Sequence, residues 1–453
     1  MTYGSLTGPL ARRPALAAEP VSGQVNRRQL RRLTYTAILV PLAWIVGVDF
    51  LFPFVVLAVV GLRASRLSAF EILGFALGLW LTFALLITAP DNMERSLSSL
   101  YSILIIFGAM ALHVVTRTLL RDVSYDTLLG FMRALYVPLF RYTIVFVILG
   151  LFLAFALGNL RISFPTVLGA ILPFSPPGIA ERSMIAEITR PDWGFGHFSV
   201  PRPLVFAPWY TAGALTVACA GLMAMVCAVM RGDTKSRELL LEAVLCVVLF
   251  LTLSRTIFGF YLIGFALASL VFRDWSRLTL ALVGLGVLLL ALVGPLSEFS
   301  VLEFRDYSTE TRFRALELGL LVAFEQSPLF GYGVKPLYEG LSIPVGSHSS
   351  IVSITVRGGL VALLLFVIFF YAIPAWFWVR RLGRLTRKRH RQRRIAALCL
   401  RFQILIWGWA VFQEIDTAAI ASSLLLMTLA VIWRVIDQID RPFDGSDEPA
   451  QIS

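Results

Sequence analysis

The sequence predicts an all-α fold, a polytopic integral membrane helical bundle that crosses the bilayer about twelve times. Of its 453 residues, 58% are hydrophobic and only 15% are charged, and the mean hydropathy is +0.79. Apolar runs of roughly 20 residues, long enough to cross a bilayer, recur along the chain. Lipid offers no hydrogen bonds to an exposed backbone, whereas a helix satisfies its own amide and carbonyl groups. Helices are therefore the expected spanning form.

The spans are expected where apolar runs are separated by polar, Pro-rich or Gly-rich segments. They fall near residues 33–47, 49–63, 69–89, 97–118, 134–158, 207–230, 238–253, 255–272, 277–296, 349–379, 395–413 and 417–437. The first two are short, and Asp49 lies between them.

Basic residues orient these spans. From a cytoplasmic N-terminus, every loop on the predicted inner side carries Lys or Arg, as the positive-inside rule requires. These residues are Arg63, Arg66, Arg117, Arg121, Arg133, Arg231, Lys235, Arg237, Arg273, Arg277 and the run from Arg380 to Arg394. Both termini are then cytoplasmic, and the net charge of +12 does not require a nucleic-acid partner.

The chain is expected to form one membrane domain between two tails. The parts are a basic cytoplasmic tail at 1–32, a membrane domain at 33–437, outer loops at about 159–206 and 297–348, a cytoplasmic basic loop at 380–394 and a cytoplasmic tail at 438–453. The N-terminus continues into RRQLRR instead of an apolar cleavable core, so it does not resemble a signal peptide.

The two outer loops differ in pattern. The first is rich in Pro, Gly and aromatic residues, as in ILPFSPPG and PDWGFGHF. The second contains residues 311–327, whose apolar residues follow a helical period that Pro328 and Gly331 end. We expect an amphipathic helix there, packed along the outer membrane face.

No motif for a metal or a nucleotide is evident. The four cysteines lie in apolar segments without CxxC spacing, and HExxH, GxSxG, Walker and DxD patterns are not found. We therefore expect no cofactor and no metal site.

Three arginines are candidates for binding an anion on the outer side. Arg255 lies between two apolar runs, at the outer end of a predicted hairpin, where it either snorkels to the interface or faces an anionic group. Arg312 and Arg314 lie on the predicted outer helix, roughly 200° apart, so only one of them can face a given ligand. Arg312 is expected to begin that helix, where backbone N–H groups also favour anions.

His348, in GSHSSIVSITVRGG, is the candidate for proton transfer, because histidine titrates near neutral pH. A purely structural role is equally compatible with the residue alone. Glu414 and Asp416, in the outer turn of the last hairpin, either orient an acceptor, hold a cation or form a plain turn. His197, in the first outer loop, is a weaker candidate. Outward arginines and a histidine suit a substrate with a diphosphate, because guanidinium groups pair with phosphate oxygens in bidentate geometry.

The order of these motifs resembles the O-antigen ligase and O-antigen polymerase superfamily. The pair Ser254–Arg255 opens a span, the arginine-bearing helix ends in SPLFGYG (Ser327 to Gly333), and SHSS precedes a span that contains VRGGLVALLLF. The span arrangement covers most of the chain, whereas the specific motifs lie between about 250 and 370.

The resemblance implies a membrane glycosyltransferase of the GT-C type in the bacterial inner membrane. Such enzymes transfer a glycan from a polyprenyl diphosphate, such as undecaprenyl diphosphate, at the outer face. The acceptor is a lipid or another growing glycan, as in O-antigen, exopolysaccharide or other cell-envelope polysaccharide biosynthesis. The reaction is expected to be metal-independent and inverting, and other polysaccharide-assembly proteins are possible partners.

Carried over to this sequence, the resemblance implies that Arg255 and Arg312 bind the diphosphate and stabilise it as a leaving group. It implies that His348 assists deprotonation of the attacking hydroxyl or helps to position the pyrophosphate. Two features depart from the pattern. Many members have an aromatic residue, often Trp, shortly after the loop arginine, where this chain has Leu316, and Arg314 makes the arginine assignment ambiguous.

Polymerase is slightly favoured over ligase, and two other classes stay open. A transporter or flippase of lipid-linked glycan would need ionisable residues within the membrane, for which Glu71, Arg141 and Glu242 are candidates. A non-enzymatic assembly scaffold would leave the arginines and the histidine unexplained.

Overall fold

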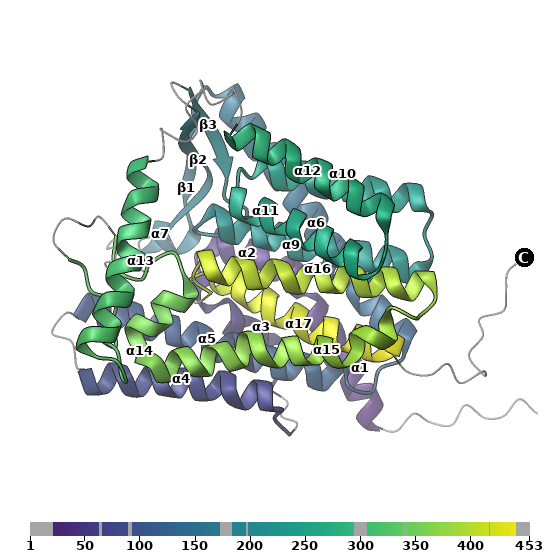
Figure 1. The fold of residues 1–453 in the computed structure, drawn as a ribbon, viewed down its shortest axis with the longest axis horizontal. Coiled ribbons are helices and arrows are strands. Elements are labelled where there is room, and N and C mark those ends of the chain that lie inside the picture. The colour runs from purple at the N-terminus through teal and green to yellow at the C-terminus, as the bar shows by residue number, and fades with distance from the viewer. Residues whose placement is uncertain are drawn as a thin grey trace, which may run out of the picture.

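The structure is a computed structural model of the chain, and it describes residues 21–62, 66–88, 93–172, 184–195, 198–293, 306–338, 341, 343–415 and 417–440. The described part is mostly helical, as the sequence predicts (Figure 1). The helices are α1 (Val21–Thr34), α2 (Thr36–Val46), α3 (Phe52–Val60), α4 (Ala69–Thr88), α5 (Met93–Leu120), α6 (Tyr125–Ala156), α7 (Val167–Ile171), α9 (Tyr210–Arg231), α10 (Lys235–Leu251), α11 (Arg255–Val271), α12 (Trp275–Val293), α13 (Asp306–Gln326), α14 (Ser350–Phe366), α15 (Ile373–Leu385), α16 (His390–Phe412) and α17 (Ala419–Asp440).

Seven helical runs of the described chain are long and apolar enough to cross a membrane: α4, α5, α6, α9, the continuous run Ser350–Leu385, α16 and α17. Each coincides with an expected span. The expected count of about twelve is not confirmed. The two N-terminal spans correspond to α2 and α3, of 11 and 9 residues. A helix rises about 1.5 Å per residue, so each covers only about half of a hydrocarbon core.

The prediction of an all-α fold is wrong in one region. The segment expected as an outer loop at 159–206 contains a three-stranded antiparallel sheet in the order β1-β2-β3. Its strands are β1 (Ile162–Pro165), β2 (Ile185–Phe195) and β3 (Phe198–Pro203). Thr189 is paired with Ile162 on one side and with Pro203 on the other, so β2 is the central strand.

The centre of the bundle is α9, whose residues from Thr211 to Met230 are all buried. Small residues permit this close packing. A side chain at Gly221 would come within 2.5 Å of Leu245 on α10. Helices α6, α10, α16 and α17 pack around α9. Apolar side chains on the outer helices remain exposed, among them Leu86, Phe152 and Leu364. This is the pattern expected where lipid replaces water as solvent.

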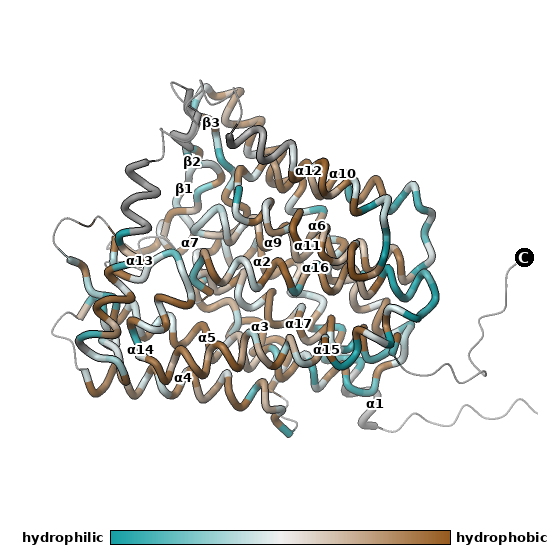
Figure 2. The backbone as a smooth tube through the Cα atoms, viewed as in Figure 1, coloured by the Kyte–Doolittle hydropathy of each residue, from teal (hydrophilic) through white to brown (hydrophobic). Residues whose placement is uncertain are grey.

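Most of the helices lie side by side along the long axis of the molecule, whereas α13 runs across it, and the bundle has two ends (Figure 1). One end, here called the strand end, holds the sheet, α13, the turn before α14 and the α16–α17 connection. The other, here called the basic end, holds the α11–α12 and α15–α16 connections. Hydrophilic residues gather at the basic end (Figure 2). Helix α1 begins at Val21, within the expected N-terminal tail, and α17 continues to Asp440.

Candidate functional site

His348 lies in the turn that leads into α14, in a backbone conformation that side chains rarely adopt. Its φ angle is +70°, in the left-handed region. Its backbone N–H donates to Oε1 of Glu414 at 2.9 Å. Such a conformation at a non-glycine residue costs about 1–3 kcal/mol and persists only where the surroundings enforce it. The histidine side chain is half-buried.

Glu414, in the α16–α17 connection, links this turn to a lysine. Its carboxylate is buried and accepts a hydrogen bond from Nζ of Lys335 at 2.5 Å. The backbone carbonyl of Lys335 in turn accepts a hydrogen bond from Arg95 on α5. Glu414 therefore fixes the backbone of His348, and Lys335 is a charged neighbour that the sequence did not single out.

The serines of SHSS anchor the start of α14. Ser349 caps the helix by accepting the N–H of Val352. The hydroxyl of Ser350 donates to the carbonyl of Gln413 at 2.6 Å and accepts the N–H of Ile415 at 2.8 Å. These contacts join the His348 turn to the end of α16 on both sides of Glu414.

The SPLFGYG segment packs, backbone to backbone, against a break in α14. Gly359 has a non-helical conformation with φ +66°. Around it, the carbonyl of Val356 accepts the N–H of Tyr332 at 2.8 Å, and the carbonyl of Pro328 accepts the N–H of Leu360 at 2.7 Å. A side chain at Gly359 would lie 2.3 Å from the backbone of Leu329. The glycine at this position therefore lets the two backbone segments approach closely.

The same break holds an arginine that sequence reasoning missed. Arg357 is only 1% exposed, within a span, and its Nε donates to the carbonyl of Ser353. Its carbonyl accepts the N–H of Gly333 at 2.9 Å. The sequence could have indicated Arg357, because a charged residue within a spanning segment is rare and often functional.

Helix α13 lies across the His348 turn. The carbonyl of Ala315 accepts the N–H of Gly346 at 3.1 Å, and a side chain at Gly319 would meet Val352 at 2.8 Å. The helix begins at Asp306, not at Arg312. Arg312 therefore lies almost two turns inside the helix, and the expected contribution from the helix N-terminus is wrong. Its side chain lies outside the described residues, whereas Arg314 is exposed.

Arg255 begins α11 and is half-buried. The preceding turn is held by Arg202 of β3, a buried residue that the sequence did not indicate. The guanidinium of Arg202 donates to the carbonyls of Thr252, at 3.3 Å, and Leu253. Leu253 has a φ angle of +52°, so this turn is also strained. Arg202 thus stabilises the C-terminal end of α10 and the turn that positions Arg255.

A continuous series of contacts connects Arg255 with His348. The guanidinium carbon of Arg202 lies 3.2 Å from the centre of the Tyr210 ring. The next residue, Thr211, donates through Oγ1 to the side-chain carbonyl of Gln413 at 3.0 Å. The backbone of Gln413 holds Ser350, two residues after His348. The predicted site residues Arg255 and His348 therefore belong to one region of the strand end that is held together by these contacts.

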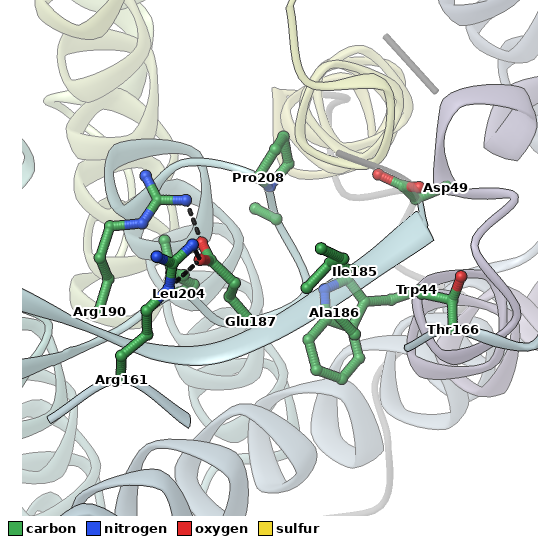
Figure 3. Close-up of a pocket in the computed structure, with 11 residues that line it drawn as sticks. Trp44, Asp49, Arg161, Thr166, Ile185, Ala186, Glu187, Arg190, Leu204 and Pro208 are labelled. Atoms are coloured by element: carbon green, nitrogen blue, oxygen red, sulfur yellow. Dashed lines mark hydrogen bonds and ion pairs between the residues drawn. The ribbon is translucent and has the colours of Figure 1, made fainter. Parts of the chain in front are cut away.

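A cavity of about 250 Å³ lies beside this region, between the sheet and α2. Figure 3 shows Arg161 and Arg190 both directed at Glu187 of β2. Oε1 of Glu187 lies 2.6 Å from Nη2 of Arg161. Because Glu187 and Asp49 both line the cavity, two carboxylates accompany the two guanidinium groups, and the cavity offers mixed donors and acceptors more than a strong anion site. None of the predicted site residues that the structure describes lines it.

Two candidates cannot be placed: His197 and Asp416 lie outside the described residues. The structure does describe the three ionisable residues that favoured a transporter, Glu71, Arg141 and Glu242. Glu71 binds Nε of Arg117 at 2.6 Å, and Glu242 binds Nη1 of Arg401 at 3.0 Å, both inside the bundle. Arg141 is exposed.

Residues 240–367 match the family model described as O-antigen ligase. The matched stretch contains Arg255, Arg312, Arg314 and His348, together with SPLFGYG and VRGG. No curated protein matches the chain significantly. The match confirms the resemblance that the order of motifs indicated.

Proposed function

Because the match over residues 240–367 supports the O-antigen ligase and polymerase superfamily as the family of this chain, we propose that it is a membrane glycosyltransferase acting in polysaccharide assembly. Its donor is a glycan linked to a polyprenyl diphosphate, and its reaction takes place at the outer face of the bacterial inner membrane. In this orientation the strand end faces outward, and both termini are cytoplasmic. Polymerase remains slightly favoured over ligase.

One observation carries the proposal: within the matched stretch, His348 is held in a strained turn by Glu414 and is connected to Arg255 by contiguous contacts. Strained residues concentrate at functional sites, where precise placement offsets their cost. If the histidine had no function, glycine in its place would remove the backbone strain. Glycine already occupies position 346 of the same turn, where φ is +79°.

In the proposed reaction, an acceptor hydroxyl oxygen bonds to the anomeric carbon of the donor sugar. The bond from that carbon to the diphosphate oxygen breaks, and the diphosphate leaves with the electron pair. The hydroxyl proton passes to the imidazole of His348. Guanidinium groups at Arg255 and Arg312 stabilise the charge that develops on the leaving diphosphate, an effect that is strong where water is excluded. A single displacement of this kind inverts the anomeric centre and needs no metal.

Helix register favours Arg312 over Arg314 as the second cation. Position 312 precedes Ala315 by three residues and Gly319 by seven, so the three share one helix stripe. That stripe lies against the His348 turn, since Ala315 and Gly319 contact it. Arg314 is exposed on the opposite side of the helix. We assign Glu414 to positioning His348, in place of the acceptor-orienting role considered from sequence.

The alternative function is transport or flipping of a lipid-linked glycan. The buried acidic residues that raised it, Glu71 and Glu242, each have an arginine partner within the bundle. Within the described residues, neither carboxylate is therefore left as an unpaired ionisable group that could bind cargo inside the bundle. This favours the transferase.

Reconstitution in vesicles with a polyprenyl-diphosphate oligosaccharide tests the proposal. A ladder of product lengths identifies a polymerase, and a single transfer to an added lipid acceptor identifies a ligase. Movement of the intact donor between leaflets, with no new glycosidic bond, would instead establish the transporter.

A further inference from the structure

A second cavity, of about 160 Å³, lies at the basic end, where the α11–α12 connection meets the first turns of α16. Five arginines line it: Arg273, Arg277, Arg393, Arg394 and Arg401. It is far along the bundle axis from the His348 turn and plays no part in the proposed transfer.

Three of these arginines are neutralised by carboxylates. Arg401 pairs with Glu242, and Arg394 pairs with Glu238. Arg277 lies 3.3 Å from Asp274 and 3.5 Å from Glu238. Within the described chain, Arg273 and Arg393 have no acidic partner, and Nε of Arg393 is buried without a hydrogen bond. The cavity therefore carries an excess of two positive charges.

The backbone at Arg273 gives an independent indication that this charge is used. Its φ angle is +56°, in the left-handed position that follows a helix end. Glycine is the usual residue there, because it adopts this conformation without strain. An arginine at this position strains the backbone, and such strain concentrates at functional positions.

The surface beside the cavity is apolar. Trp275, at the rim, is 64% exposed, and Leu280, Leu282 and Val283 of α12 are more than half exposed. Tryptophan is enriched at the membrane interface, and exposed aliphatic residues on a spanning bundle face acyl chains. A ligand with a phosphate and attached hydrocarbon chains would satisfy both parts of the surface at once.

We propose that this cavity binds the headgroup phosphate of an anionic glycerophospholipid from the adjacent leaflet. Arg273 and Arg393 contact the phosphate, and the acyl chains lie along α12. Basic pockets between spanning helices recognise anionic headgroups in this way. The site would make the stability of the bundle depend on anionic lipid, whatever reaction the strand end performs.

The test compares the full chain in nanodiscs of phosphatidylcholine alone and of phosphatidylcholine with phosphatidylglycerol. The melting temperature and the lipid retained in native mass spectrometry are measured for wild type, R273G, the double variant R273G/R393Q and R387Q. Arg387 is an exposed arginine of the same end that does not line the cavity, so R387Q controls for surface charge.

Phosphatidylglycerol is expected to raise the melting temperature of wild type and R387Q but not of the double variant, whose lipid affinity should fall about 30-fold. R273G alone should be at least as stable as wild type in phosphatidylcholine, because glycine relieves the strained φ, and yet respond less to phosphatidylglycerol. This single variant keeps the test decisive if the double variant does not fold.

Three results would overturn the proposal. The double variant, or R273G if the double variant does not fold, could retain the full response to phosphatidylglycerol. R387Q could lose the response as completely as the cavity variants, which would indicate a diffuse surface effect. Soluble glycerol phosphate could reproduce the shift in phosphatidylcholine alone, which would identify a soluble phosphate ligand instead of a lipid.

Discussion

The two ends of the molecule each place a side chain in the left-handed backbone region, but they support it differently. At the strand end, the N–H of His348 is held by Glu414, and the neighbouring serines are fixed to the α16–α17 connection. At the basic end, Arg273 lies in an exposed turn among charges of both signs. Hydrogen bonds on several sides fix the position of the His348 backbone. The excess positive charge around Arg273 attracts an anion but does not fix its position. The first arrangement suits bond-making, and the second suits binding.

The orientation of the two ends gives an all-or-none test. Leu337, at the strand end, and Arg387, at the basic end, are both exposed, whereas no native cysteine is. In spheroplasts, a membrane-impermeant maleimide should label L337C, and it should label R387C only after lysis. The unmodified chain is the control. Labelling of R387C and not of L337C in intact spheroplasts would reverse the orientation and contradict the outer-face reaction.

Among the site arginines, the largest loss is expected from R312Q and R255Q. Removing one preorganised group that stabilises a leaving anion lowers kcat by about 10²–10³-fold. R314Q is the matched control, since it removes the same charge from the same helix and should change kcat by less than about twofold. Equal losses for R312Q and R314Q would contradict the assignment by helix register.

Arg202 should act through Arg255 and not on the substrate. R202M removes the donors to the carbonyls of Thr252 and Leu253. A hydrogen bond to a charged group contributes about 1.5–3 kcal/mol to the stability of the folded state. We expect a lower melting temperature and a raised KM for the donor, with partial rescue by R202K. An unchanged KM in a destabilised variant would show that Arg202 is only structural, and an unchanged or raised melting temperature would contradict the stabilising role of its hydrogen bonds.

Two substitutions of Glu414 should distinguish its hydrogen bond to the His348 backbone from its ion pair with Lys335. E414A leaves the N–H of His348 without its acceptor and should cost about 1–3 kcal/mol of stability together with activity. E414Q retains a carbonyl acceptor but loses the charge opposite Lys335, so its effect on kcat should be smaller. If E414Q is as inactive as E414A, the charge, and not the position of the histidine backbone, is what matters.

Sequence patterns anticipated the helical architecture because apolar length and helical period are local properties. The seven long spans and α13 follow this rule. The sheet does not, because Pro165, Pro191 and Pro201 lie in its strands, and proline argues against a strand. The depth reached by α2 and α3 also depends on packing, which apolar composition alone does not reveal.

The candidate site was anticipated in part for the same reason. His348, Arg255 and the arginines of α13 stand out as polar residues in apolar surroundings. Arg202 and Lys335 do not, because their importance comes from partners 50 and 79 residues away, Thr252 and Glu414. Contacts of this range are set by the assembled bundle and have no local signature.

The central claim is that the His348 turn performs glycosyl transfer. The most direct measurement is single-turnover transfer from a polyprenyl-diphosphate oligosaccharide by reconstituted wild type, H348A and the control H390A, which alters a histidine at the basic end. We predict a rate lowered by about 10²–10⁴-fold for H348A, at an unchanged melting temperature, and a wild-type rate for H390A. Transfer by well-folded H348A at the wild-type rate would contradict the account.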